Sequence, residues 1–317
     1  MVLSVVLLTG GCSYDAAGLG TSSESTGSES STSAGMEGPS STSTGGVDGT
    51  TTGSSSSSGS AGSSSGEPDT STGPEVPMLV EEGLLARWYV DEAAAGTDPT
   101  AVIDHHAPGV DLPLVYADDQ PMYAALDGNR GLGWDAIQLD GRAVVDIAGT
   151  KLESELTGTT EATFELVLSV EEVTTDVSRF LHFGGGGGGG DFAIGSSFLD
   201  RLVIRWGGST LCEFESDFGS PERRVVHVVV ETNATDANER VRAYIDGVAL
   251  MLTDAGAPDQ GAGLPLDPSA ALTLGNRSDG QRSFRGHLQY AAIYTTVLDQ
   301  EQIDGNVALL LASDDAP

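Results

Sequence analysis

Residues 272–294, with the sequence LTLGNRSDGQRSFRGHLQYAAIY, decide the fold class of this chain. Apolar residues fill positions 272–274 and most of 284–294, and polar turn-forming residues lie between them at Asn276-Arg277-Ser278-Asp279-Gly280. Apolar runs rich in β-branched and aromatic residues, bounded by Asn, Asp, Gly and Ser, are typical of β-strands and turns. The stretch therefore predicts two strands joined by a turn.

Short apolar stretches separated by turn residues recur from residue 83 onward. Asp140-Gly141 and Asp246-Gly247 lie between apolar runs, a pattern that predicts tight β-hairpins. No stretch alternates strands with long amphipathic helices, so a parallel α/β fold is disfavoured. Many short strands with turns between them predict an all-β antiparallel jelly-roll sandwich. The expected strands are 84–90, 134–139, 143–147, 162–170, 179–183, 191–194, 202–206, 211–215, 225–231, 241–245, 248–252, 272–274 and 284–294.

A short C-terminal helix is expected after the last strand. Asp299 and Gln302 stand three residues apart ahead of an apolar run, which is the spacing of a capping box at a helix start. Residues 151–156 could form one further helical turn.

The chain divides by composition into a tether and a folded domain. Residues 13–77 are mostly Ser, Thr and Gly and contain no Lys or Arg. Such a segment has little apolar surface to bury and cannot offset the entropy of ordering, so it is expected to be a disordered tether. Its root-mean-square span would be about 45 Å. Residues 78–317 have the length of a single β domain.

The N-terminus carries a targeting pattern. An apolar run at residues 1–8 leads into Thr9-Gly10-Gly11-Cys12. Small residues before a Cys that closes a short apolar run resemble a bacterial lipoprotein signal. The resemblance implies a signal peptide at residues 1–12, lipidation of Cys12, and sorting by Ser13 to the bacterial outer membrane or cell surface.

The charge of the chain excludes one class of partner. Forty-seven acidic residues oppose 14 basic ones, which gives a net charge of −33. A chain this acidic is repelled by nucleic-acid phosphates and by anionic lipid surfaces, so we expect no nucleic-acid partner and membrane attachment through the lipid anchor alone. The second cysteine, Cys212, lies in an alternating apolar run and is expected to be a small buried hydrophobe.

Five motifs, taken in their order along the chain, resemble laminin G-like, concanavalin A-like jelly-roll domains. That resemblance implies an extracellular binding module or, less often, a glycan hydrolase. It also implies a calcium ion held by oxygen ligands, for which Asp91, Asp140 and Asp279 are the candidates, although Gln289 stands where relatives have Asp. The motifs are GLLARWYVDE at 83–92, TFELV at 163–167, VVHVVV at 225–230, RVRAYIDG at 240–247 and GHLQY at 286–290.

An acidic run offers the alternative of catalysis. Glu213, Glu215 and Asp217 occupy alternate positions, so on a strand they would share one face, with backbones about 6–7 Å apart. Hydrolases of the superfamily carry carboxylates in this way, and converging side chains could reach the spacing of a retaining glycosidase pair. The simpler interpretation is a solvated acidic face, and we favour it because the final acid is Asp rather than Glu and few aromatic residues flank the run.

Two other conspicuous sequences have plain interpretations. Asp104-His105-His106 is the densest histidine cluster, but adjacent side chains diverge, so an exposed polar loop is expected rather than a metal site. The seven glycines at 184–190 lack the Lys-Ser/Thr ending of a phosphate loop and are expected to form a hairpin loop.

Taken together, these features predict a surface lipoprotein whose jelly roll binds an extracellular glycan or protein without catalysis. The concave face of a sheet and the loops at the rim are the expected binding surfaces, while Trp88, Trp134 and Trp206 are expected to be mostly core. A glycoside hydrolase and a structural or adhesive component of the envelope remain the alternatives.

Overall fold

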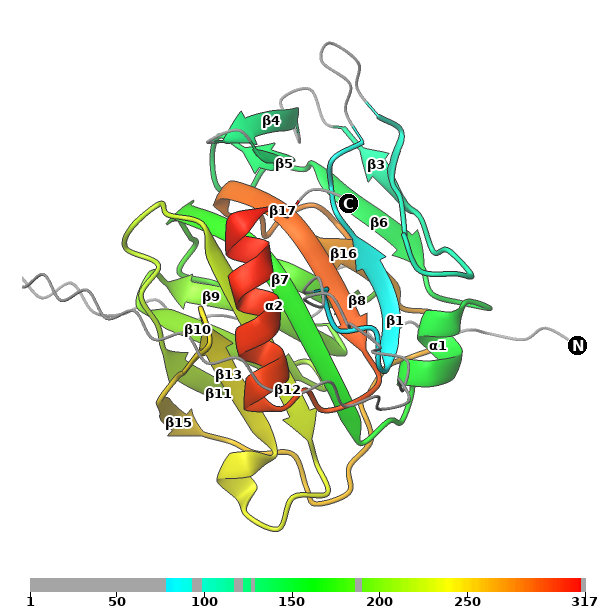
Figure 1. The fold of residues 1–317 in the computed structure, drawn as a ribbon, viewed down its shortest axis with the longest axis vertical. Coiled ribbons are helices and arrows are strands. Elements are labelled where there is room, and N and C mark those ends of the chain that lie inside the picture. Colours follow the sequence, from blue (N-terminus) through cyan, green and yellow to red (C-terminus); the bar gives the residue numbers. More distant parts are fainter. Residues whose placement is uncertain (1–77, 93–98, 117–121, 127–128, 186–189, 315–317) are drawn as a thin grey trace, which may run out of the picture. The chain divides into compact units, whose positions relative to one another are not determined.

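In the computed structural model, the predicted signal peptide and tether, Cys12 included, lie outside the described residues. The fold consists of two antiparallel sheets and two helices (Figure 1). The prediction of an all-β jelly-roll sandwich with a short C-terminal helix is confirmed. Within the described part, no helix is long and apolar enough to cross a membrane. The described residues are 78–92, 99–116, 122–126, 129–185 and 190–314.

The first sheet has eight strands, paired in the order β14-β13-β12-β7-β17-β5-β4, with β1 also paired to β17. Its longest strands, β7 and β17, run side by side at the centre. Its strands are β1 (Leu84–Trp88), β4 (Met122–Leu126), β5 (Asn129–Trp134), β7 (Glu161–Glu172), β12 (Arg224–Glu231), β13 (Val241–Ile245), β14 (Val248–Ala249) and β17 (Arg285–Tyr294).

The second sheet has nine strands, in the order β15-β11-β10-β9-β8-β16-β6-β3-β2. These strands are β2 (Ala101–Val102), β3 (Leu112–Val115), β6 (Arg142–Asp146), β8 (Ser178–Gly184), β9 (Phe192–Phe198), β10 (Arg201–Trp206), β11 (Ser209–Glu215), β15 (Leu252–Ala255) and β16 (Ala271–Leu274). The helices are α1 (Lys151–Leu156) and α2 (Gln300–Ala312), with a 3-10 turn at Ala237–Glu239.

The main core lies between the two sheets. Phe164 from β7 stacks on Phe192 from β9, with ring centroids 4.7 Å apart, so one aromatic pair joins the sheets. Trp134 packs on Phe284, which also contacts Phe180. Such pairs add about 0.5–1.5 kcal/mol each beyond the burial of their surface. Trp88 and Trp134 are buried as expected.

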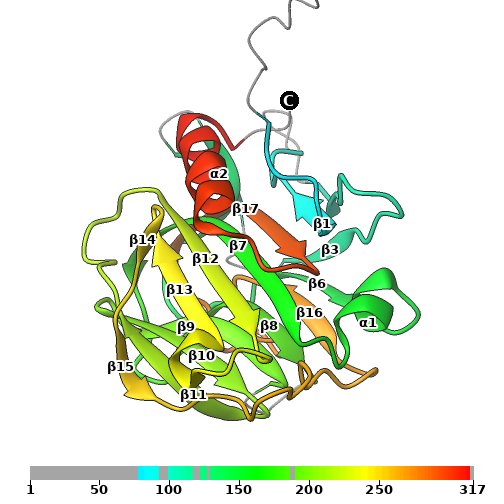
Figure 2. The ribbon, with the colours of Figure 1, turned by 60° about the horizontal axis from the view of Figure 1, so that its bottom comes forward.

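A second apolar layer covers the outer face of the eight-stranded sheet. Helix α2 lies across β17, β7 and β12 (Figures 1 and 2). The predicted capping box forms, because the Asp299 carboxylate accepts from the backbone N–H of Gln302 while the Gln302 side chain accepts from that of Asp299. The buried residues that join helix and sheet include Val167, Val225, Val229, Tyr290, Ile303, Val307 and Leu310.

The predicted hairpin at Asp140-Gly141 is wrong. Strand β5 belongs to the eight-stranded sheet and β6 to the nine-stranded sheet, so residues 135–141 connect the two layers. The indole N–H of Trp134 donates to the carbonyl of Gly141 at 2.9 Å and holds this connection against the core. A turn sequence predicts that the chain reverses its direction, but it does not predict whether the two flanking strands pair with each other.

Strands β2, β3 and β4 in the N-terminal part were missed, and the strand expected at 134–139 is β5 at Asn129–Trp134. Both β2 and β3 lie at an edge of the nine-stranded sheet, and Pro113 is part of β3. Proline cannot donate to a sheet ladder. Strand β3 lies between the edge strand β2 and β6, but Pro113 itself pairs only with β2, because the pairing with β6 begins at Leu114.

The predicted hairpin at Asp246-Gly247 is confirmed by the pairing of Ile245 with Val248. Both turn residues have positive φ, 51° and 79°, the conformation of a type I′ turn. We expect Gly247→Ala to lower the free energy of unfolding by about 1–2 kcal/mol, because alanine is strained at this φ and its Cβ would lie 2.7 Å from Asp304 Oδ1.

Urea unfolding monitored by tryptophan fluorescence measures this loss. Gly149→Ala is the matched control, since Gly149 has a φ of 71° but an alanine Cβ there would have no neighbouring atom within 4 Å. A Gly247→Ala loss no greater than that of Gly149→Ala would contradict the steric part of the argument.

Candidate ligand-binding face

The outer face of the nine-stranded sheet carries a cluster of basic and polar side chains. On β8, Leu181 and Phe183 belong to the core between the sheets, so His182 between them points to the opposite, outer face. Its partners across the neighbouring strands are Ala193 on β9 and Thr273 on β16. These positions lie at the middle of the sheet.

Several polar atoms on this face are buried without a hydrogen-bond partner. Both ring nitrogens of His182, the hydroxyl of Thr273 and the Nε of Arg179 are in this state among the described residues. His182 and Thr273 are fully buried, and Arg179 is 2% exposed. A buried donor or acceptor left unpaired costs about 1–3 kcal/mol, so three neighbouring cases mark this face as a candidate for ligand binding.

The charges of three further arginines influence the pKa of Arg179. Burial, together with the positive charges of Arg205, Arg282 and Arg277, lowers the pKa of Arg179 to about 9. Burial and the charges of Arg179 and Arg277 likewise lower the pKa of His182 to about 3, so its ring is neutral at physiological pH. We refer to Arg179, Arg205, Arg277 and Arg282 as the arginine cluster.

The arginine cluster comes from separate parts of the chain. Arg179 and Arg205 lie on β8 and β10, and the other two lie in the connection between β16 and β17. Arg277 Nε donates to Asp279 at 2.7 Å, and Arg282 donates to the exposed Asp176 at 3.0 Å.

Arg205 donates to the main-chain oxygen of Gly208 and to the hydroxyl of Thr210.

The arginine cluster was not predicted from the sequence, because its other members lie 26 to 103 positions after Arg179 and leave no local pattern. Only the general scarcity of basic residues could have drawn attention to them.

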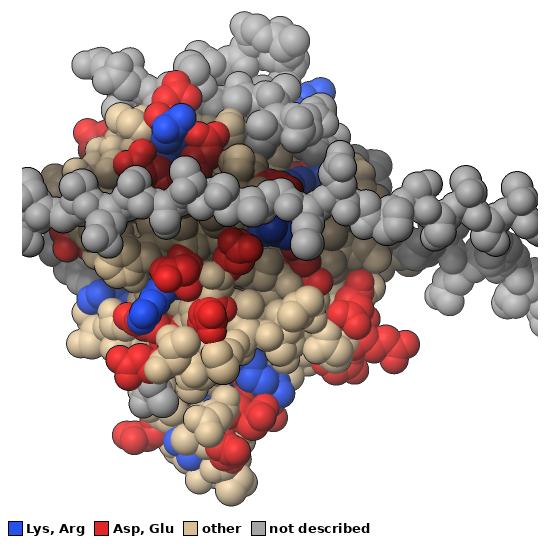
Figure 3. All heavy atoms as spheres, turned by 90° about the vertical axis from the view of Figure 1, so that its left-hand side faces the viewer, with Lys and Arg blue, Asp and Glu red and all other residues tan. Residues whose placement is uncertain are grey.

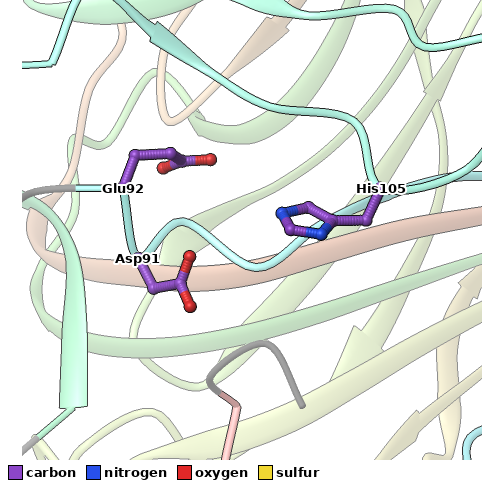
Figure 4. A group of neighbouring side chains, drawn as sticks. All are labelled: Asp91, Glu92 and His105. Carbon is purple, nitrogen blue, oxygen red and sulfur yellow. The ribbon is translucent and has the colours of Figure 1, made fainter.

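The calcium candidates do not assemble as one site. Asp91 lies with Glu92 and His105, and one potential ligand atom from each falls within 4.8 Å of the others. Figure 4 shows the His105 ring directed toward the two carboxylates. Across the described residues this is the one such group of three, and neither Asp140 nor Asp279 belongs to it. Instead, Asp279 pairs with Arg277.

The neighbouring Asp104 differs from the expectation of an exposed loop. Its carboxylate is buried and accepts from the backbone N–H groups of Arg87, His106 and Val110 at 2.9–3.0 Å. Lys151, the one lysine of the chain, approaches the same carboxylate at 2.7 Å. Asp104 therefore organises the loop after β1.

Glu213, Glu215 and Asp217 share the outward side of β11 and its extension. They alternate with the buried residues Cys212, Phe214, Ser216 and Phe218, so the expected common face is present. Arg201 Nη1 lies 2.8 Å from the Glu213 carboxylate, which is thus held in an ion pair. Glu215 and Asp217 are exposed, so the arrangement shows no enclosed pair of carboxylates.

Cys212 is buried, and burial raises the pKa of its thiol to about 12, as a structural cysteine requires.

A second buried polar cluster lies under α2. The carboxylate of Glu165 accepts hydrogen bonds from Tyr290, Tyr294 and Asn306, and His227 Nε2 lies 2.7 Å from it. The partners of Glu165 satisfy its buried charge, so this cluster joins helix and sheet rather than presenting a site.

Figure 3 shows one face of the molecule, with acidic side chains spread over it rather than gathered in one patch. Basic groups are scarce in the whole chain, and four of its 13 arginines form the cluster on β8, on β10 and in the β16–β17 connection. The arginine cluster is therefore the local exception in a strongly acidic protein.

Solved structures resemble this fold at low sequence identity. A Trypanosoma rangeli sialidase in complex with the inhibitor DANA superposes with a TM-score of 0.50 and 16% identity, covering 72% of this chain and 33% of the sialidase. The binding domain of botulinum neurotoxin serotype D/C superposes with a TM-score of 0.50 and 11% identity, covering 72% of this chain and 52% of the toxin domain. The chain thus spans about a third to a half of these proteins.

No curated protein matches the sequence. A family model does match, over residues 144–304, which include strands from both sheets and the start of α2. This match covers half of the chain and agrees with the two-sheet architecture. The chain belongs to the concanavalin A-like lectin/glucanases superfamily.

Proposed function

We propose that this protein is an exported, lipid-anchored bacterial surface protein whose jelly roll binds an extracellular glycan without catalysis. The binding surface is the outer face of the nine-stranded sheet. The observation that carries this proposal is the group of buried, unpartnered polar atoms of His182, Thr273 and Arg179 on that face. Buried polar groups are normally paired, so a ligand that supplies partners accounts for them.

On the other sheet, Ser169, His287 and Gln289 also carry buried, unpartnered polar atoms, but the charges that act on His287 are those of Glu171 and Asp135 rather than those of arginines. Helix α2 covers part of the outer face of this sheet with apolar side chains, and the Glu165 carboxylate beneath the helix is hydrogen-bonded by its neighbours. The fold that this chain shares with a toxin binding domain supports a binding role, and the ion pair of Glu213 with Arg201 disfavours a hydrolase at the acidic run.

A glycan array and polysaccharide pull-downs with the full-length protein test the proposal. Each is run with calcium and again with a chelator, because Asp91, Glu92 and His105 offer ligands for a divalent cation. We expect specific binding to at least one glycan. Loss of that binding in chelator would place calcium in the binding-competent state. Absence of binding under both conditions would overturn the glycan assignment and leave a protein ligand.

Lipid attachment at Cys12 would remove one free thiol, and the number of free thiols can be measured. A lipidated Cys12 has no free thiol, so protein extracted from bacterial membranes is expected to titrate one thiol after denaturation, that of Cys212. Before denaturation it is expected to titrate none, because Cys212 is buried with a raised pKa.

The Cys12→Ser variant is the control and is expected to appear in the soluble fraction. Two titratable thiols in the denatured wild-type protein, or membrane retention of the variant, would contradict the anchor.

A further inference from the structure

We propose that the outer face of the nine-stranded sheet recognises a negatively charged group on the glycan, a carboxylate or a sulfate ester, with Arg179 as the central contact. Arg205, Arg277 and Arg282 surround that contact, and the side chains of His182 and Thr273 line it. This inference rests on the proposed function and adds to it the chemical class of the ligand.

The charge of Arg179 has no ion-pair partner among the described residues. Its Nη1 donates to the main-chain oxygen of Val177, its Nε has no partner, and no carboxylate within the described residues forms an ion pair with it. A buried charge is costly unless it is paired, and the charges that lower the pKa of Arg179, those of Arg205, Arg282 and Arg277, have the same sign as its own. A bound anion would supply the missing opposite charge.

The donors on this face have a geometry that suits an anion. A guanidinium offers parallel N–H groups that match the two oxygens of a carboxylate or sulfate. Arg205 and His182 lie on the same face at the same level of the sheet, since both pair with Ala193 from opposite sides. Adjacent strands are about 4.8 Å apart, so the two side chains are separated by about 10 Å, which leaves space for one anionic group between them.

His182 and Thr273 add neutral hydrogen-bonding groups beside the arginines. With its pKa near 3, the His182 ring carries one N–H and one free lone pair, so it can donate to an anion or bond to a neighbouring sugar hydroxyl. The Thr273 hydroxyl, across the strand pair from His182, can do the same. Charged and neutral donors side by side fit a sugar that bears an acidic substituent among hydroxyl groups.

Gly184 and Gly190 contribute to this arrangement. A Cβ on Gly190 would lie 2.3 Å from His182 Nε2, and one on Gly184 would lie 3.1 Å from His182 Cε1. A side chain at Gly190 would displace the imidazole, and one at Gly184 would press against it. Glycine at these two positions therefore leaves room for the His182 ring.

The overall charge makes the expected binding selective. A protein with a net charge of −33 repels polyanions at long range, so a basic patch produces binding only where the anion reaches the arginine cluster. Long-range repulsion is screened by salt more strongly than close contact is. Binding of a polyanion by this chain would therefore report a local site rather than general attraction.

The test uses full-length protein and three immobilised polysaccharides: polygalacturonate for carboxylates, dextran sulfate for sulfate esters, and unmodified dextran as the neutral control. We expect binding to at least one of the two polyanions and none to dextran. The polyanion that binds identifies the anionic group. Arg179→Met is expected to weaken that binding at least about tenfold, the loss of one charge-assisted contact.

The melting temperature of Arg179→Met is a second measurement, and it distinguishes a binding role of Arg179 from a structural one. Because Arg179 is an uncompensated buried charge in the free protein, Arg179→Met is expected to keep or raise the melting temperature while it removes binding. Arg205→Gln, on a half-buried side chain, is expected to weaken binding as well and serves if Arg179→Met fails to fold. Arg285→Gln is the control, since Arg285 lies on β17 of the other sheet and pairs with Glu171.

The outcomes separate this inference from the proposed function. If the protein binds only neutral glycans, or if Arg179→Met and Arg205→Gln bind polyanions as tightly as Arg285→Gln does, the anionic site is wrong while a glycan-binding role stands. If the protein binds none of these polysaccharides and no glycan on the array, both are wrong. A lowered melting temperature of Arg179→Met with binding intact would show that Arg179 is structural.

Discussion

Glu165→Ala is expected to lower the free energy of unfolding by about 3–5 kcal/mol, the loss typical of breaking a buried charged network. Glu165 is fully buried on β7 and contacts four side chains from three elements: His227 on β12, Tyr290 and Tyr294 on β17, and Asn306 on α2. Removal of the carboxylate leaves all four without their shared acceptor.

The same cluster extends to the start of the domain. Arg87 Nε on β1 donates to the hydroxyl of Tyr290 at 3.1 Å, and Asn306 Oδ1 accepts from the backbone N–H of Val80 at 2.9 Å. Helix α2, the central strands and the segment before β1 are thus joined through Glu165. We therefore expect its replacement to loosen α2 as well as to lower global stability.

The pH dependence of stability gives an independent check on Glu165. Burial opposes its ionisation, but hydrogen bonds from His227, Asn306 and Tyr290 outweigh burial and lower its pKa below the usual value. A carboxyl whose pKa is lower in the folded state stabilises the fold above its unfolded pKa, about 4.3, and loses that contribution as the pH falls. Wild type is therefore expected to lose more stability below pH 4 than Glu165→Gln.

Guanidinium unfolding at pH 7 and at pH 3–4 measures both effects. Glu172→Ala is the matched control, since Glu172 is an exposed carboxylate at the end of the same strand. Equal losses for Glu165→Ala and Glu172→Ala, or parallel pH profiles for wild type and Glu165→Gln, would refute the role assigned to Glu165.

Asp104→Ala is the second change with a large expected effect, again about 3–5 kcal/mol. It removes the acceptor of three backbone N–H groups and leaves the ammonium of Lys151, 9% exposed, without its opposite charge. The loop after β1 would lose its organising group. Lys151→Met is expected to cost less, about 1–2 kcal/mol, because the Asp104 carboxylate keeps its three N–H donors.

A double-mutant cycle of Asp104→Ala and Lys151→Met in urea measures the coupling. We expect the double variant to be less destabilised than the sum of the single variants, since it removes the unpaired ammonium. Strict additivity would mean that the 2.7 Å contact contributes nothing to stability.

Local patterns in the sequence were enough to predict the fold class. Alternation along β11 correctly placed Cys212 inward and the acidic residues outward, and the capping box of α2 and the Asp246-Gly247 hairpin depend on a few adjacent residues. Pairing between distant strands was not predictable in this way. The Asp140-Gly141 turn joins two sheets because the Trp134 ring packs between them, which turn chemistry does not encode.

The binding face was largely invisible from the sequence. Its charged members meet only because β8, β10 and the connection after β16 converge, and Arg179 lies 103 positions before Arg282. His182 gave no indication beyond its alternation with apolar residues. Of the calcium candidates, Asp91 followed a recognisable strand end and lies in a group of potential ligands, whereas Asp279 is engaged by an adjacent arginine.

Hydrogen–deuterium exchange of the full-length protein, with and without the tightest-binding polysaccharide, tests the central claim most directly. If the ligand occupies the outer face of the nine-stranded sheet, slowed exchange is expected at β8, at β10 and in residues 275–284. Unchanged exchange there, with protection confined to α2 or to the loop that carries Asp91 and His105, would contradict the assignment of the binding face.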